Sequence, residues 1–89
     1  MSKRLDYLLE LLKSTPDDSF VLFALAKEYE GAGDLTRALE FYENLRGKNP
    51  GYVGLYYHLG KLFEQKQDFD RAVATYKQGI ETARKASDF

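Results

Sequence analysis

Apolar residues recur along this chain at the spacing of one face of an α-helix. Between residues 19 and 31 they fill positions i, i+3, i+4 and i+7, which is the buried stripe of an amphipathic helix. This first stripe consists of Leu22, Leu25, Ala26 and Tyr29. The next window carries a similar stripe at Leu35, Ala38, Leu39, Tyr42 and Leu45. The pattern predicts two helices in succession.

Turn-forming residues separate these two windows. The first window ends at Gly31-Ala32-Gly33-Asp34, where glycine accepts the left-handed conformation that ends a helix and Asp34 can cap the next helix with its carboxylate. The second ends near Gly47, ahead of Asn49-Pro50-Gly51, because proline has no amide hydrogen with which to continue a helix. Residues 19 to 52 are therefore expected to form a helix-turn-helix unit.

Residues 53 to 86 repeat the same plan. Their first stripe is Tyr56, Leu59, Gly60 and Phe63, and their second is Phe69, Ala72, Val73, Tyr76 and Ile80, with Asp68 as the expected cap. Laid over residues 19 to 52 without a gap, they give the identical pairs Leu25/Leu59, Lys27/Lys61, Glu30/Glu64, Asp34/Asp68, Arg37/Arg71, Ala38/Ala72 and Tyr42/Tyr76. Since Pro16 also precedes Pro50 by 34 residues, the chain is built on one internal repeat.

The segment before the first repeat carries a leucine stripe of its own. Leu5, Leu8, Leu9 and Leu12 follow the i, i+3, i+4, i+7 spacing. We expect a helix over about residues 3 to 13 that acts as the second helix of an earlier half-repeat and covers the first full one. Membrane-surface binding by this helix is the weaker alternative, because Asp6 and Glu10 accompany its basic residues.

The repeat resembles the tetratricopeptide repeat, whose signature is Trp-x2-Leu-Gly-x2-Tyr, then Ala-x3-Phe, then Pro. The first unit has Leu22-x2-Leu25-Ala26-x2-Tyr29, Ala38-x3-Tyr42 and Pro50, and the second has Tyr56-x2-Leu59-Gly60-x2-Phe63 and Ala72-x3-Tyr76. The resemblance implies a single all-α domain of residues 1 to 89. Its five helices would form antiparallel helix-turn-helix repeats stacked as a short right-handed α-solenoid.

Two positions depart from the family pattern. Arg84 replaces the closing proline, so the last helix is expected to continue through Ala86. Gln67 stands where the first unit has Gly33, and a left-handed conformation there would cost roughly 1 kcal/mol more than for glycine.

The resemblance also implies a protein-binding role, because the first helices of such repeats line a concave surface in the family. Positions on those helices outside the buried stripes are the candidates for a peptide groove: Phe20, Phe23, Lys27, Glu30, Tyr57, His58, Lys61 and Glu64. Aromatic rings beside lysines suit an extended peptide or a partner helix that carries acidic groups. Phe20 and Phe23 could instead pack beneath the N-terminal helix.

Self-association is the alternative function. The last helix would present a face that no further repeat of the chain covers, with the candidates Val73, Tyr76, Lys77, Ile80 and Ala83. Repeat arrays of this kind generally need covered ends, so a homodimer through this face is a second hypothesis.

Composition narrows the remaining classes. A net charge of −1 gives no field that would attract nucleic acid, and no apolar stretch is long enough to span a membrane. The absence of cysteine excludes thiol chemistry and fits the cytoplasm, the location we expect. His58 is the sole histidine, so no histidine pair exists for acid-base or metal chemistry. We expect a non-catalytic protein with no cofactor or metal.

Overall fold

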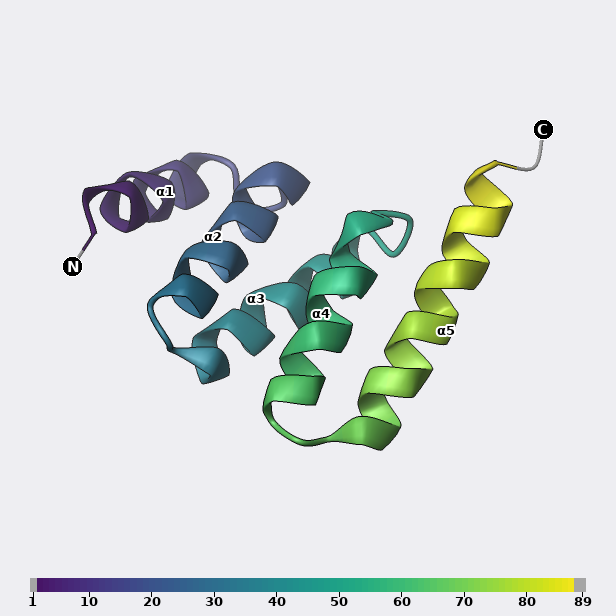
Figure 1. Ribbon diagram of the computed structural model, residues 1–89. Helices are drawn as coiled ribbons and strands as arrows, with labels where there is room; N and C mark the ends of the chain where they lie inside the picture. The colour runs from purple at the N-terminus through teal and green to yellow at the C-terminus, as the bar shows by residue number, and fades with distance from the viewer. Residues whose placement is uncertain (1, 88–89) are drawn as a thin grey trace. The chain divides into compact units, whose positions relative to one another are not determined.

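The computed structural model describes residues 2–87, and all of its regular structure in that range is helical (Figure 1). The helices are α1 (Lys3–Ser14), α2 (Ser19–Gly31), α3 (Leu35–Lys48), α4 (Gly54–Gln65) and α5 (Phe69–Ala86). The first three belong to one compact unit that ends at Asn49, and α4 and α5 belong to a second unit that begins at Pro50. Both full repeats are antiparallel helix pairs, as the apolar pattern predicted.

Aspartates cap α2, α3 and α5, and the sequence predicted those at Asp34 and Asp68. The side chains of Asp18, Asp34 and Asp68 each accept a hydrogen bond from a backbone N–H three residues ahead, at 3.1, 3.1 and 3.3 Å respectively. Such caps satisfy amides that have no partner inside the helix. The last helix continues to Ala86, as the missing proline indicated.

The turn inside each repeat has the same backbone course although its residues differ. In the first unit the amide of Asp34 donates to the carbonyl of Tyr29, and in the second the amide of Asp68 donates to that of Phe63, both at 2.9 Å. The residue before each aspartate has a positive φ: 82° at Gly33 and 61° at Gln67. Gln67 therefore adopts the left-handed conformation that its alignment with Gly33 predicted, and a side chain makes that conformation costly.

In the first unit, α1 packs on α2 through leucines and small residues. Leu5 and Leu8 lie in one cluster with Val21, Ala24 and Leu25, while Leu9 and Leu12 are only partly buried at its edge. The suggestion that Phe20 and Phe23 pack beneath α1 was wrong for Phe20, whose side chain is 62% exposed. Val21 and Ala24 occupy this contact because they project from α2 on the side facing α1.

In the second unit, α5 contacts α4 through a narrower face than its apolar residues suggested. Ala72 and Thr75 are buried, whereas Phe69, Val73 and Ile80 are 61%, 52% and 60% exposed. Their assignment to the buried stripe was therefore wrong. The contact is centred on small residues that let the helices approach, which leaves the larger apolar side chains on the flank of α5.

A close contact with an atom fixed directly to the backbone of α4 lies at Gly79. A Cβ built there would lie 2.6 Å from Cβ of Tyr56, and Tyr56 is itself buried. Because that atom is attached directly to the backbone of α4, it cannot swing aside. The spacing of the two helices is thus set by the missing side chain of Gly79.

Replacing Gln67 with glycine is expected to stabilise the protein. The variant Gln67→Gly removes the steric strain of a side chain in the left-handed conformation, so the free energy of unfolding should rise by about 0.5–1 kcal/mol. The reciprocal variant Gly33→Gln should lower it by about 1 kcal/mol. Urea denaturation followed by circular dichroism measures both changes, and a loss of stability in Gln67→Gly would contradict the assignment of strain.

Adding a methyl group at Gly79 is expected to push α4 and α5 apart. The variant Gly79→Ala should lower the free energy of unfolding by about 1–3 kcal/mol, the usual cost of overpacking. Gly47→Ala is the matched control, because Gly47 also lies within a helix but has open space around it. That control should gain up to about 1 kcal/mol from alanine's helix propensity, and equal effects in both variants would refute the close contact.

Candidate protein-binding site

Three side chains of α4 form a group that we name the α4 platform: Tyr57 and Lys61, which are exposed, and His58, which is partly exposed. The ring of Tyr57 is 58% exposed, and the ammonium of Lys61, one turn later, lies 5.4 Å from its centroid. The ring of His58 meets that of Tyr57 edge-on at a centroid distance of 5.3 Å. The cation over the ring face orders both side chains, so the platform offers a flat apolar surface beside a positive charge.

The equivalent positions of α2 form a different surface. Phe23, which matches Tyr57, is only partly exposed and its ring contacts that of Tyr42 edge-on at 6.2 Å. Lys27, which matches Lys61, is exposed, and Phe20 lies open one turn before Phe23. At this position the first unit therefore presents a less exposed ring than the second unit does.

Two of the groove candidates have a structural task. Glu30 accepts a hydrogen bond of 2.7 Å from the hydroxyl of Tyr42, and Glu64 accepts one of 2.6 Å from the hydroxyl of Tyr76. Each bond ties the first helix of a repeat to the second. Sequence reasoning missed this role, although the identity of both residues in both repeats was the available signal.

These hydrogen bonds and the burial of the rings raise the pKa values of the two tyrosine hydroxyl groups. Loss of hydration raises the pKa of Tyr76 to about 12, with the hydrogen bond to Glu64 contributing further. Burial, followed by the bond to Glu30, raises the pKa of Tyr42 as well. Both phenols therefore remain protonated donors well above neutral pH.

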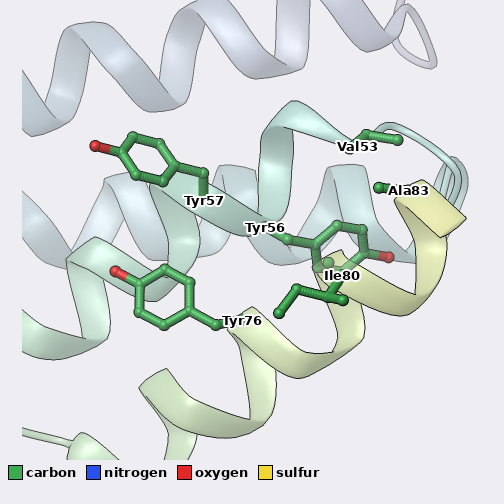
Figure 2. Close-up of a pocket in the computed structure, with 7 residues that line it drawn as sticks. Val53, Tyr56, Tyr57, Tyr76, Ile80 and Ala83 are labelled. Carbon is green, nitrogen blue, oxygen red and sulfur yellow. The ribbon is translucent and has the colours of Figure 1, made fainter.

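An apolar hollow of about 380 Å³ opens between α4 and α5. Its lining residues are Val53, Tyr56, Tyr57, Tyr76, Gly79, Ile80 and Ala83. Figure 2 shows the rings of Tyr57 and Tyr76 along one side, with their hydroxyl groups pointing the same way, while Tyr56 and Ile80 lie toward the other side. The structure thus joins Tyr57, a groove candidate, to Tyr76, Ile80 and Ala83 from the self-association set. Val73 and Lys77 lie outside the hollow.

Neither metal-binding nor membrane-spanning features occur in the part of the chain that the structure describes. Within residues 2–87, no three histidine, cysteine, aspartate or glutamate side chains gather as a metal site would require. No helix in the same range combines the length and the apolar character needed to cross a bilayer.

The repeated helix pairs, their capped turns and the small residues between them define a class of helix-turn-helix repeat protein, and comparison with known proteins gives the family. The sequence model of the tetratricopeptide repeat matches residues 29–89, more than half of the chain. The chain therefore belongs to the tetratricopeptide repeat family, as its motif predicted. No curated protein sequence matches it.

Solved structures agree with this assignment. A crystal structure of a tetratricopeptide repeat domain protein from Salinibacter ruber is 48% identical, with a TM-score of 0.73, and 76% of each chain is covered. A solution structure from the same organism, also 48% identical, has a TM-score of 0.76 and covers 79% of this chain and 71% of that one. A crystal structure of MamA has a TM-score of 0.91 at 25% identity, and this chain spans 50% of its length. The all-α repeat fold is confirmed, and it implies an interaction or scaffold role, since such repeats generally serve as non-catalytic interaction modules.

The two tyrosine bonds predict a loss of stability at alkaline pH. The folded state holds the proton of Tyr76 more tightly than the unfolded state, so this stabilisation is complete below pH 10 and is lost as pH rises to about 12. Tyr42 acts in the same direction. In Tyr76→Phe, the decline of the unfolding free energy across this interval should be shallower than in the original protein.

Urea denaturation at a series of pH values measures this slope. Tyr7→Phe is the control, because Tyr7 is 63% exposed on α1, and it should keep the full decline. An unchanged slope in Tyr76→Phe would contradict the proposed coupling of the phenol to folding.

Proposed function

We propose that this protein binds an acidic peptide or partner helix through the exposed face of α4, with the α4 platform as the main contact. The observation that carries this proposal is the exposed ring of Tyr57 held beneath the ammonium of Lys61. Large rings buried on binding supply most of the free energy at many protein interfaces. A neighbouring cation favours a partner with carboxylates.

The hollow beside the platform supports the same proposal. Its wall is nearly all aromatic and aliphatic, and Tyr57 belongs to both surfaces. An apolar side chain of the partner could enter the hollow while an adjacent carboxylate meets Lys61. Such an arrangement combines apolar burial with charge-based orientation, as protein interfaces commonly do. Lys27 and Phe20 offer a further cation and ring on α2. A role for Glu30 and Glu64 in partner contact, and a cytoplasmic location, stay predictions.

Self-association through α5 is the second candidate function. The observation in its favour is the exposed apolar flank at Phe69, Val73 and Ile80. Exposed apolar patches of this kind mark interaction surfaces in many proteins. The two functions share the hollow, because Tyr57 of the platform and Ile80 of the flank both line it, whereas Val73 lies outside it.

Variants of the α4 platform test partner binding. Peptides selected from a random display library against the original protein should be rich in acidic residues next to apolar ones. Tyr57→Ala should weaken their binding by at least about tenfold, and Lys61→Ala by less, with a reduced dependence on salt. Isothermal titration calorimetry measures both effects.

Two further variants serve as controls for that experiment. Lys66→Ala removes an exposed cation at the end of α4 and should leave affinity unchanged. Val73→Glu should not weaken peptide binding but should reduce the mass measured by sedimentation. Ile80 is unsuitable for this purpose because it lines the hollow. Full affinity in Tyr57→Ala would refute the proposal.

A further inference from the structure

One side of α5, which is partly to fully exposed, has the spacing of a coiled-coil seam. Its apolar residues are separated alternately by four and three positions, and we name them the α5 seam: Phe69, Val73, Tyr76, Ile80 and Ala83. This alternation keeps a stripe facing a second helix along its whole length. Phe69, Val73 and Ile80 are more than half exposed, and α5 has 18 residues, a length of about 27 Å.

Charged residues follow the seam on one flank at intervals of seven. They are Asp70 in the first turn of α5, Lys77 near its middle and Arg84 in its last turn, and all three are exposed. Asp70 and Arg84 are fourteen positions apart, about 21 Å along the helix. A parallel copy of α5 would place each Asp70 beside another Asp70 and far from either Arg84. An antiparallel copy brings Asp70 of each chain to Arg84 of the other, twice.

The seam is also self-complementary in shape when the second copy runs antiparallel. Phe69 projects at the start of α5, while Ile80 and Ala83 line the hollow near its end. A two-fold axis between Tyr76 and Lys77 sets Val73 against Ile80 and places Phe69 beside Ala83 of the second copy. Each phenyl ring then has an apolar hollow of about 380 Å³ within reach. Lys77 of one chain lies near Lys77 of the second chain at the axis. The long flexible side chains let the two ammonium groups move apart into water.

We propose that two copies of this chain pair through antiparallel α5 helices, with Phe69 of each copy seated in the hollow of the other and Asp70 paired with Arg84. The pairing is isologous, because the same surface is used by both copies. It rests on the second proposed function, self-association, and adds the direction of the helices and the residue that fills the hollow.

Cross-linking of single-cysteine variants tests the direction. The chain contains no cysteine, so Asp70→Cys and Arg84→Cys each carry one thiol. Each variant alone, and then an equilibrated mixture of both, is treated with a short bismaleimide and separated on a denaturing gel. The antiparallel pairing predicts covalent dimers in the mixture and none from either variant alone. Dimers from Asp70→Cys alone would show parallel pairing and overturn the proposal.

Sedimentation equilibrium over a concentration series tests the seating of Phe69. Phe69→Ala should raise the dimer dissociation constant at least tenfold. Tyr7→Ala is the matched control, since Tyr7 is 63% exposed and Phe69 61%, and its constant should be unchanged. Equal constants for Phe69→Ala and the original protein would refute the seating of Phe69 while leaving self-association intact. A monomer at every concentration would overturn both, and peptide binding by the α4 platform would stand independently.

Discussion

The close approach of the two helices within a repeat governs most of what this protein presents to its surroundings. A Cβ at Gly79 would meet Cβ of Tyr56 at 2.6 Å, and one at Gly60 would meet the ring of Tyr76 at 2.4 Å. Only residues without a side chain allow this spacing. Interiors pack densely, so the ring of Tyr76 fills the space beside Gly60, and its hydroxyl group reaches Glu64 of the first helix.

The close contact between α4 and α5 also explains why the second unit has apolar side chains on its surface. Small residues and Tyr76 occupy the face of α5 that touches α4, and consequently Phe69, Val73 and Ile80 stand on the flank. The hollow exists for the same reason, because Gly79 and Ala83 leave room between Tyr56, Tyr57 and Ile80. The surface that we associate with binding is thus a direct result of how the helix pair is packed. The platform and the hollow share Tyr57, which links the two proposed interactions physically.

Repetition of a sequence position does not imply repetition of its environment. Tyr42 is fully buried, whereas the matching Tyr76 is only partly so, and the pKa of each phenol responds to its own loss of hydration. Phe23 is partly covered and contacts Tyr42, whereas Tyr57 is exposed beneath Lys61. The two repeats therefore have similar backbones but different surfaces. The surfaces differ at the positions that we propose for partner binding.

The sequence by itself determined the helices, their aspartate caps, the left-handed residue at Gln67 and the family, because periodicity and turn chemistry act between residues close together in the chain. Only the tertiary structure showed that Glu30 and Glu64 bind tyrosines of the opposite helix, and that Phe69 lies outside the core. An apolar stripe shows which side of a helix can be buried, but the width of the contact depends on the side chains of the facing helix. The hollow beside Tyr57 likewise depends on the tertiary structure, because its lining residues come together only when α4 and α5 pack.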